Sequence, residues 1–370
     1  MKIDNSKTII LSGGGSGGPV TPLLAVAKEL AADNFNLVFV GTKTGPEKSM
    51  VASFNLPGNK KLKFISLPAG KLRRYFSLHN FSDLLRIFAA FILSFPLLRR
   101  ERPSLIISAG GFVSVPLVWA ARLKNIPIII HQQDVRPGLA NKLMAPAARL
   151  ITVSFEKSLR DYGPKAVWIG NPIVALENQA DAIKIIKEKY QLSDSKPLIL
   201  VTGGATGAVA LNDLIVGAKS KILEFAQIIH ISGKGKLPPL PISSEPASDY
   251  QVFELLSPAD VLQLMAAADL VISRCGLATL TELCELGKVA ILIPIPKSQQ
   301  EDNAVIFKRL NAARVLSQSE LSADDLVAEI KNILSSSELR AKLSSNISKV
   351  MKRQASETMA ALIKEILAAN

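Results

Sequence analysis

The chain has 370 residues, of which 48% are hydrophobic and 20% charged, which excludes a disordered chain and predicts two domains of roughly 100–200 residues each. The formal net charge of +13 favours an anionic partner such as a nucleic acid, a phosphorylated substrate or an acidic lipid. Aromatic residues make up only 5%, which leaves little for base stacking, so we expect no nucleic-acid partner.

The N-terminal residues and the cysteines indicate a cytoplasmic protein. Residues 1–7 lack the apolar core of a signal peptide, so we expect the protein to stay where it is made. Cys275 and Cys284 are too few for a disulfide framework, and reduced thiols fit best.

Along the chain, short apolar runs alternate with helical patterns, which predicts parallel strands covered on both faces. We therefore expect two doubly wound α/β units, residues 1–170 and 171–350, with a C-terminal helix over residues 350–370 that packs back on the first. The boundary falls at the turn residues Gly170–Pro172. The expected strands are Thr8–Ser12, Leu37–Gly41, Phe64–Leu67, Leu105–Ser108, Ile126–His131 and Leu150–Val153, then Leu198–Thr202, Gln227–Ser232, Gln251–Glu254, Leu270–Ser273 and Val289–Ile293.

The first expected strand ends in a glycine-rich loop, Ser12–Pro19, which opens a helix over Pro22–Ala32. Glycine lets the backbone approach a phosphate closely, and a helix N-terminus supplies free N–H groups and partial positive charge. A nicotinamide site is disfavoured, because the next strand ends in Val40–Lys43 without the acidic residue that holds a ribose. A tight turn is the plainer interpretation, but the loop has more small residues than a turn needs.

The segment after the third expected strand is basic and rich in phenylalanine. Its apolar run, Ile87–Leu98, is shorter than the ~20 residues of a spanning helix and contains Ser94 and Pro96. We predict that it lies in the interface of an anionic membrane; a buried helix with solvated ends is the alternative. The residues assigned to this surface are Lys71, Arg73, Arg74, Phe88, Phe91, Phe95, Arg99 and Arg100.

Two more glycine loops, Ala109–Ser114 and Gly203–Ala208, each stand between an expected strand and a helix. Ligands of doubly wound sheets bind at the carboxyl ends of the strands. Two loops in the first unit and one in the second therefore predict two diphosphate sites, one for a donor and one for an acceptor.

Several short motifs, in their order and spacing, resemble those of the MurG-type N-acetylglucosaminyltransferases of peptidoglycan synthesis along nearly the whole chain. The resemblance implies the GT-B fold, in which two doubly wound Rossmann-like α/β domains face each other across a cleft. The motifs are Gly110–Ser114, His131–Gln133, Gly170–Pro172, Gly203–Ala208, Arg274–Gly276, Thr281–Glu282 and Gln299–Ala304.

The same resemblance implies a reaction and a location. The reaction is inverting transfer of N-acetylglucosamine from UDP-N-acetylglucosamine to undecaprenyl-diphosphate-linked N-acetylmuramoyl-pentapeptide, or lipid I, without a metal or cofactor. The location is peripheral, on the cytoplasmic face of the bacterial inner membrane. In the sequence we find no Asp-x-Asp pair or His/Cys cluster with metal-ligand spacing.

By this resemblance the donor site falls in the second unit. Glu282 matches the glutamate that holds the ribose hydroxyls of UDP, and side-chain amides suit a neutral sugar because they both donate and accept. The third loop would stabilise the charge that grows on the leaving UDP. The assigned donor residues are Gly203, Gly204, Ala205, Thr206, Gly207, Arg274, Gly276, Glu282, Gln299, Gln300 and Asn303.

The acceptor site falls in the first unit, where loops one and two would hold the lipid diphosphate. The assigned residues are Gly14, Gly15, Ser16, Gly17, Gly18, Gly110, Gly111 and Ser114.

The chain departs from the family's pattern in the residues expected to line the site. Pro19 stands where the family has histidine, Phe112 where it has tyrosine, and Ile173–Ala175 where it carries an arginine near the donor diphosphate. These departures leave open a UDP-sugar transferase with a different lipid or polysaccharide acceptor, or a catalytically weakened membrane-bound relative.

Inverting transfer needs a general base, and two residues are candidates. Asp134 stands where the family has a neutral amide, and His131 is the second candidate. The plainer interpretations are an Asx turn for Asp134 and a structural, hydrogen-bonded strand-end histidine for His131.

Overall fold

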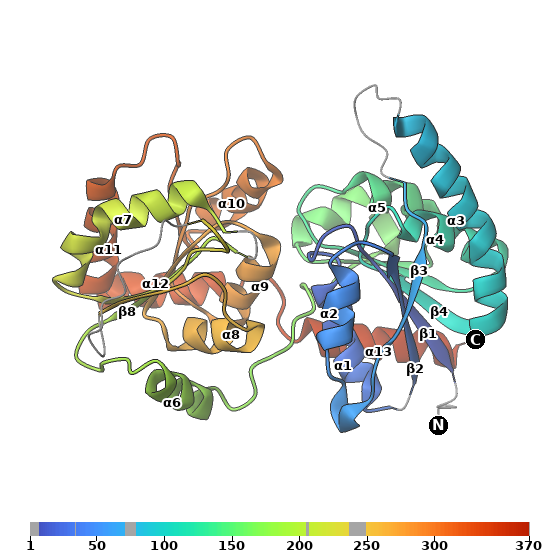
Figure 1. Ribbon diagram of the computed structural model, residues 1–370, viewed down its shortest axis with the longest axis horizontal. Coiled ribbons are helices and arrows are strands. Elements are labelled where there is room, and N and C mark those ends of the chain that lie inside the picture. The colour runs from blue at the N-terminus through green and yellow to red at the C-terminus, as the bar shows by residue number, and fades with distance from the viewer. Residues whose placement is uncertain (1–6, 34, 71–78, 205–206, 237–248, 370) are drawn as a thin grey trace. The chain divides into compact units, whose positions relative to one another are not determined.

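The computed structural model describes residues 7–33, 35–70, 79–204, 207–236 and 249–369. Its contacts divide the chain into two units (Figure 1). Unit 1 comprises Met1–Val174 and Lys352–Asn370, and unit 2 comprises Ala175–Met351. The chain thus leaves unit 1 once and returns to it.

Unit 1 is built on a seven-stranded parallel sheet of order β3-β2-β1-β4-β5-β6-β7. The strands are β1 Thr8–Ser12, β2 Asn36–Thr42, β3 Lys63–Leu67, β4 Pro103–Ser108, β5 Ile128–Gln132, β6 Leu150–Val153 and β7 Ala166–Trp168. The helices are α1 Thr21–Ala31, α2 Glu47–Ser53, α3 His79–Glu101, α4 Ser114–Leu123, α5 Leu139–Met144 and α13 Ala355–Ala368, with the short 3-10 turns η1 Pro57–Asn59, η2 Ala145–Ala147, η3 Glu156–Asp161 and η4 Gly163–Lys165.

Helices cover both faces of this sheet because successive strand residues point to opposite sides. Ile9 and Leu11 of β1 pack in the same cluster as α1 and α13. Ile10, between them, packs in a second cluster with α3 and α4. Both faces of β1 are therefore buried, which explains why β1 is an apolar run rather than an alternating one.

Unit 2 repeats this plan with six parallel strands in the order β10-β9-β8-β11-β12-β13. Its core joins β8 to α7 and α11 through buried Ile and Leu side chains. The strands are β8 Leu198–Thr202, β9 Gln227–Ile231, β10 Tyr250–Phe253, β11 Leu270–Ser273, β12 Ala290–Leu292 and β13 Arg314–Val315; the helices are α6 Gln179–Lys189, α7 Val209–Leu223, α8 Pro258–Ala267, α9 Leu277–Leu286, α10 Gln299–Arg309, α11 Ala323–Ser335 and α12 Ser337–Ile347.

The predicted pair of doubly wound units is confirmed, and every expected strand is present within two residues of its expected ends. The sequence analysis did not predict β7 and β13, which are edge strands of three and two residues with little buried surface.

In each sheet the strand order reverses next to the first strand, between β1 and β4 and between β8 and β11. Such switch points are where ligands bind in open α/β sheets, and all three glycine loops lie at them.

The return to unit 1 depends on a close backbone approach at Gly170. Its φ is +86°, and a Cβ there would lie 2.0 Å from the Lys352 carbonyl oxygen. The hydroxyl of Ser356, at the start of α13, accepts from the Ile173 amide at 3.0 Å and donates to the Ile173 carbonyl at 2.8 Å. The structure therefore changes units after Val174, whereas the sequence analysis put the boundary at residue 170.

Candidate active site

The third glycine loop joins β8 to α7 in unit 2. Gly204 and Gly207 have φ of +79° and +68°, and the Gly207 amide donates to the Gly204 carbonyl at 3.0 Å. Ala205 and Thr206 lie outside the described residues. Among the described residues no side chain caps α7, whose first-turn N–H groups could bind an anion.

A second loop of unit 2, which follows β9, packs directly on the third glycine loop. A Cβ on Gly207 would lie 2.5 Å from the Ser232 carbonyl oxygen and 3.0 Å from Cγ of Lys236. Asn212 holds this loop from α7, donating to the carbonyls of Ser232 at 3.0 Å and Lys236 at 3.2 Å. The Lys236 side chain is exposed and lies across Gly207, a cation that the sequence analysis did not single out.

The loops after β11 and β12 are tied together by the polar residues expected at the donor site. Arg274 is 5% exposed and donates from Nη1 to the Ile293 carbonyl at 2.9 Å, so its guanidinium supports the two loops. The Gln300 Oε1 atom accepts from the amides of Cys275 and Ile295, both at 3.2 Å. Gly276 occupies the N-cap position of α9. On α10, Asn303 is buried, whereas Gln299 is exposed at the start of the helix.

Glu282 differs from these residues because no described residue hydrogen-bonds or ion-pairs with its carboxylate. It lies on α9 and is half-buried. Burial raises the pKa of Glu282 from its ordinary 4.5 to about 7. A desolvated carboxylate without a partner can accept hydrogen bonds from a ligand's hydroxyls.

In unit 1, the first and second glycine loops pack against each other at the switch point. A Cβ on Gly111 would lie 2.5 Å from the Gly14 carbonyl oxygen, and φ of +96° also restricts this position to glycine. The hydroxyls of Ser12 and Ser114 are 2.9 Å apart, and Ser114 also donates to the Gly110 carbonyl at 3.2 Å. Ser114 therefore links the two loops from inside. The sequence analysis had expected it to face the acceptor diphosphate instead.

Glu47, which the sequence analysis missed, fills the first half of the first loop. Its side chain is fully buried, and its carboxylate accepts from the amides of Thr42 at 2.7 Å and Gly15 at 3.3 Å, and from the Thr42 hydroxyl. A Cβ on Gly14 would lie 2.5 Å from Glu47 Oε1. The expectation for Gly14 is not supported, because the Glu47 carboxylate fills the space beside it, whereas Gly15 is exposed with open space beside it. Ser16, Gly17 and Gly18 remain at the surface or near it.

The two candidate bases, His131 near the end of β5 and Asp134 in the turn after it, differ sharply in environment. His131 is 1% exposed; its Nδ1 is 3.0 Å from the Thr152 hydroxyl and its Nε2 is 2.9 Å from Asn171 Oδ1. Burial lowers the pKa of His131 to about 4. Both ring nitrogens are committed, so His131 has a structural environment, and the expectation that it faces the reaction is not supported.

Asp134 is half-buried in the turn after β5. The neighbouring Gln133 side chain donates to the Ala109 carbonyl at 3.2 Å, which ties this turn to the second glycine loop. Asn141 of α5 lies beside the second glycine loop, since its Oδ1 would be 3.1 Å from a Cβ on Gly110. This Oδ1 atom is buried and has no hydrogen-bond partner among the described residues. The sequence analysis missed Asn141.

The segment predicted to lie in a membrane is helix α3. None of the described helices has both the length and the hydropathy that a bilayer crossing requires. Phe88 is 64% exposed, but Phe91 and Phe95 correct the expectation, because they pack edge-to-face on each other and against the core. Arg99 and Arg100 are exposed, and Arg100 pairs with Glu101 at 2.7 Å; Lys71, Arg73 and Arg74 lie outside the described residues.

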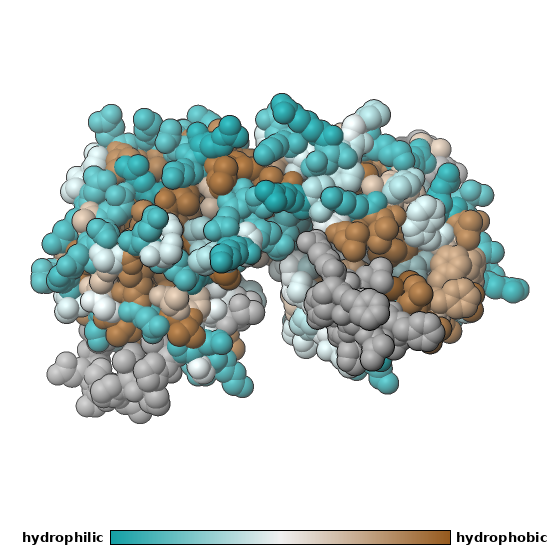
Figure 2. All heavy atoms as spheres, turned by 90° about the horizontal axis from the view of Figure 1, so that it is seen from above, coloured by the Kyte–Doolittle hydropathy of each residue, from teal (hydrophilic) through white to brown (hydrophobic). Residues whose placement is uncertain are grey.

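Other exposed hydrophobic side chains extend this surface. Leu84, Leu85, Phe88 and Ile92 recur at helical spacing along α3, and Figure 2 shows hydrophobic side chains gathered on the part of the face that unit 1 forms. The exposed residues that we group as the apolar surface are Leu84, Leu85, Phe88, Ile92 and Leu93 of α3, Trp119 and Leu123 of α4, and Leu143 of α5.

Within the described part of the chain, no three His, Cys, Asp or Glu side chains gather as metal ligands. Two family models match the chain, one in each half. The glycosyltransferase family 28 N-terminal domain matches residues 9–153, and the family's C-terminal domain matches residues 198–362. The chain belongs to glycosyltransferase family 28.

Curated family 28 relatives align over most of this chain. A Clostridium kluyveri protein is 35% identical over 333 residues, which are 88% of this chain and 91% of the relative. A protein of Clostridium botulinum strain Langeland is 36% identical over 332 residues, 88% of this chain and 90% of the relative. Both are named UDP-N-acetylglucosamine--N-acetylmuramyl-(pentapeptide) pyrophosphoryl-undecaprenol N-acetylglucosamine transferase. The predicted MurG-type resemblance is confirmed.

Solved structures support the same fold. The crystal structure of Acinetobacter baumannii MurG matches with a TM-score of 0.74 and 23% identity, covering 97% of this chain and 99% of its own. The UDP-GlcNAc 2-epimerase of Neisseria meningitidis, solved with UDP-GlcNAc bound, matches with a TM-score of 0.67 and 13% identity, covering 97% of this chain and all of its own. At these identities the likeness establishes the fold alone.

Proposed function

We propose that this family 28 enzyme transfers N-acetylglucosamine from UDP-N-acetylglucosamine to undecaprenyl-diphosphate-linked N-acetylmuramoyl-pentapeptide, with inversion. The relatives' shared name supports this, since they align over nine-tenths of their own length. In the reaction, the acceptor hydroxyl oxygen bonds to the anomeric carbon, the carbon–oxygen bond to UDP breaks, and the hydroxyl proton passes to a base.

The observation that carries the proposal is the partnerless carboxylate of Glu282. An ionised carboxylate accepts hydrogen bonds only, so two adjacent ribose hydroxyls satisfy it. The UDP diphosphate would meet the N–H groups at the start of α7 and the Lys236 ammonium, since Lys236 lies across Gly207. Charge developing on the leaving UDP would then be stabilised without a metal.

In unit 1, the acceptor diphosphate is assigned to the second glycine loop and to the open half of the first. Gly110 and Gly111 both have positive φ, at +103° and +96°, which turns successive backbone groups along the loop. Asn141 Oδ1, buried beside Gly110, would accept from a donor group of the acceptor. Asp134 is proposed as the general base because its turn is bonded to this loop through Gln133.

The apolar surface is proposed to hold the protein on the cytoplasmic face of the bacterial inner membrane. Exposed Leu, Ile and Phe side chains on α3 would enter the interface, while Arg99 and Arg100 would meet acidic headgroups. A peripheral location suits an acceptor whose undecaprenyl chain stays in the bilayer.

A second candidate function is transfer from a UDP-sugar to a different lipid-linked acceptor. Pro19 and Phe112 replace polar side chains that the resemblance expects at the acceptor loops, and Glu47 fills half of the first loop. These differences concern unit 1, so they bear on the acceptor and leave the donor assignment unchanged.

Ligand-induced thermal stabilisation tests the donor half of the proposal. Ligand that binds only the folded state raises the melting temperature by mass action. UDP-N-acetylglucosamine should raise it in the wild type, whereas NAD and ATP at the same concentration should not. Equal stabilisation by ATP would show that the site recognises the phosphates and not the uridine of UDP, and would contradict the proposal.

A further inference from the structure

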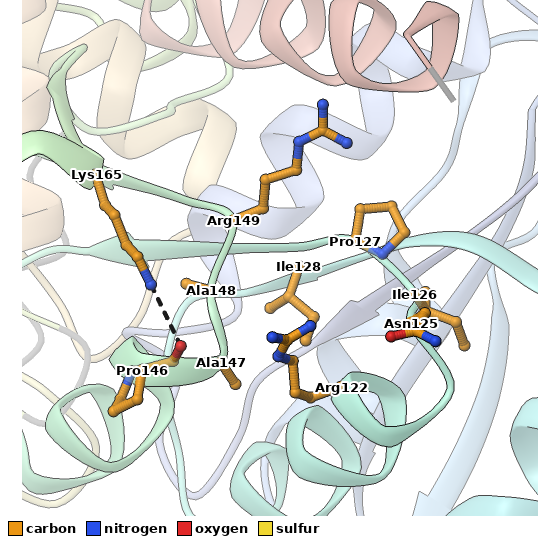
Figure 3. A pocket seen from close by; sticks show the side chains of 10 residues that line it. All are labelled: Arg122, Asn125, Ile126, Pro127, Ile128, Pro146, Ala147, Ala148, Arg149 and Lys165. Atoms are coloured by element: carbon orange, nitrogen blue, oxygen red, sulfur yellow. Dashed lines mark hydrogen bonds between the residues drawn. The ribbon is translucent and has the colours of Figure 1, made fainter.

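A cavity of about 350 Å³ lies in unit 1 beside the starts of β5 and β6, at the edge of the sheet opposite the glycine loops (Figure 3). The Arg149 guanidinium is directed away from Arg122, so these two cations do not face one ligand. Lys165 Nζ donates to the Pro146 carbonyl at 3.3 Å. Buried polar side chains that do converge belong to unit 2, beside the loop that carries Lys236.

Three side chains of unit 2 form a continuous run of hydrogen bonds. His230 of β9 is fully buried; its Nδ1 lies 2.9 Å from the Tyr250 hydroxyl of β10, and its Nε2 lies 3.0 Å from Asn212 Oδ1 of α7. Asn212 is also fully buried, and its Nδ2 donates to the carbonyls of Ser232 and Lys236. We call Tyr250, His230 and Asn212 the His230 network. It begins at β10 and ends on the loop that follows β9.

The hydrogen bonds of the His230 network can run in one direction only. Because Asn212 Nδ2 donates to two carbonyls, which only accept, its Oδ1 must face His230. This Oδ1 also accepts only, so His230 carries its proton on Nε2, and Nδ1 is left to accept from the Tyr250 hydroxyl. Burial raises the pKa of Tyr250 to about 12 and lowers that of His230 to about 4. The phenol therefore keeps its proton, and the ring stays neutral.

The loop that the network holds touches the third glycine loop through its backbone. Gly233 has φ of +86°, and a Cβ on it would lie 2.4 Å from Gly207 Cα. The Lys236 amide donates to the Gly233 carbonyl at 3.1 Å and closes the turn. The position of this turn therefore sets both the backbone that packs on Gly207 and the start of the Lys236 side chain.

The strands themselves are already paired without the network. β9 and β10 pair along four registered residues each, and the Ser232 amide extends the ladder by donating to the Phe253 carbonyl at 2.9 Å. The network adds a bond to the Lys236 carbonyl, on the far side of the turn. A buried polar chain costs free energy unless its members are satisfied, and here each donor meets an acceptor. What the network adds to the sheet is a fixed position for this loop.

We propose that His230 is a positioning residue for the donor diphosphate. Acting through Asn212, it holds the loop after β9 so that the Lys236 ammonium and the N–H groups at the start of α7 face the same diphosphate. This role rests on the proposed function, which makes UDP the carrier of the donor sugar. Glu282, assigned to the ribose, lies on α9 outside the network. Loss of the network should therefore weaken contacts to the phosphates and spare those to uridine.

Two amide substitutions separate the two nitrogens of His230. In His230→Gln the amide nitrogen comes near the place of Nε2 and can still donate to Asn212. The side chain of His230→Asn is one carbon shorter, so it reaches toward Tyr250 but not Asn212. Both variants lose the imidazole ring from the same buried site, and melting temperatures establish that each is folded.

The readouts are the affinities for UDP and for uridine, measured by calorimetric titration with competition for the weaker ligand. His230→Asn should bind UDP about tenfold more weakly than the wild type and uridine equally well, and His230→Gln should keep most of the UDP affinity. Lys236→Gln should weaken UDP binding in the wild type but less in the His230→Asn background, because both changes remove one shared interaction. Lys184→Gln, at an exposed lysine of α6, is the charge-matched control and should change neither affinity.

Nitrogen-15 NMR of the wild type tests the network without any substitution, since the shifts of the two ring nitrogens report which one carries the proton. We expect Nε2–H in His230. A proton on Nδ1, equal UDP affinity of the two His230 variants, or an equal loss of UDP and uridine affinity in His230→Asn would each overturn the positioning role. A wild type that binds no UDP would contradict the proposed function itself, whereas UDP binding together with any of those three results would contradict only the role of His230.

Discussion

Glu282 carries an electrostatic cost in the unliganded protein. Its folded-state pKa, about 7, lies above the 4.5 of an exposed glutamate, so the folded state holds the proton more tightly. The stability that this gives is fully present below pH 4.5 and is lost as the pH rises to 7. Above pH 7 the half-buried carboxylate is ionised, and no described residue pairs with it.

Replacing Glu282 with glutamine should therefore separate stability from binding. At pH 8 we expect the Glu282→Gln protein to unfold at higher denaturant concentration, gaining about 1–3 kcal/mol, because the neutral amide avoids the cost of a buried charge. The gain should vanish near pH 4.5. Calorimetric titration should show UDP bound at least tenfold more weakly.

The matched control is Glu301→Gln on α10, an exposed glutamate. It should change neither quantity measurably. Unchanged UDP affinity in Glu282→Gln would remove this residue from the donor site.

Asp134 is the residue that we propose as the general base. A positioned base contributes about 10²–10⁴-fold to transfer, so Asp134→Asn should lower kcat by that factor while the KM for the donor stays near its wild-type value. The pH–rate profile should lose its acidic limb. Steady-state kinetics should be measured for Asp134→Asn and for a control, Asp161→Asn, at an exposed aspartate of the same unit. Full activity in Asp134→Asn would exclude it as the base.

At the scale of elements, Glu47 acts as an internal ligand for the first glycine loop. It joins Thr42 at the end of β2 to Gly15 after β1, and Gly14 in turn supports Gly111 of the second loop. One buried carboxylate thus fixes the relative positions of both acceptor loops. Gly14, Gly41 and Gly45 leave the space that it occupies.

Removing this ligand should disturb acceptor binding before donor binding. Glu47→Ala leaves the amides of Thr42 and Gly15 without their carboxylate partner, which costs up to about 1–3 kcal/mol at half-buried Thr42 and less at exposed Gly15, where water can replace it. We expect reduced stability, a raised KM for the lipid acceptor and unchanged UDP affinity, because UDP is assigned to unit 2. Chemical unfolding and separate donor and acceptor titrations check this. A raised donor KM with a normal acceptor KM would contradict the proposed role.

Two buried histidines set the acid sensitivity of the sheets. Burial lowers the pKa of both His131 in β5 and His230 in β9 from 6.5 to about 4. Each must gain a proton on unfolding below pH 6.5, so the stability they contribute is present above pH 6.5 and is lost as the pH falls toward 4. Unfolding measured at pH 7, 5.5 and 4.5 should show this fall, and His131→Gln should flatten it. An equal slope in the variant would contradict it.

The sequence indicated the elements well because strand burial and glycine loops are local signals. Continuous Ile, Val and Leu runs marked β1, β4, β8 and β11, and the loops that follow them lie at the switch points as expected. Glu47 was not predictable, since its burial depends on glycines that only the folded sheet brings together. Phe95 shares a helical face with Phe88, yet the end of α4 covers it through Lys124, a tertiary contact that periodicity does not reveal.

At the scale of the whole molecule, the proposed function assigns the donor to unit 2, and the acceptor and the membrane contact to unit 1. The apolar surface and the acceptor loops both belong to unit 1, while Glu282 and the third loop belong to unit 2. In this proposal, an acceptor anchored in a bilayer and a soluble nucleotide-sugar would bind to different units of the chain.

This division predicts that membrane binding depends on unit 1 alone. Phe88 is 64% exposed, and burying its ring in lipid is worth about 1.5–3 kcal/mol, so Phe88→Ser should weaken vesicle binding roughly tenfold or more. Leu310→Ser, at a 52% exposed position of unit 2, is the control. Sedimentation with vesicles containing phosphatidylglycerol measures both. Equal binding by the two variants would place the membrane contact elsewhere.

The most direct test of the transferase proposal is a transfer assay with radiolabelled UDP-N-acetylglucosamine and a lipid I analogue. The wild type should move the label into the lipid-soluble product without added metal, and Glu282→Gln should reduce the transfer. UDP binding without label transfer to this acceptor would contradict the assigned acceptor and favour a different lipid-linked one. Neither UDP binding nor transfer would contradict the proposed function as a whole.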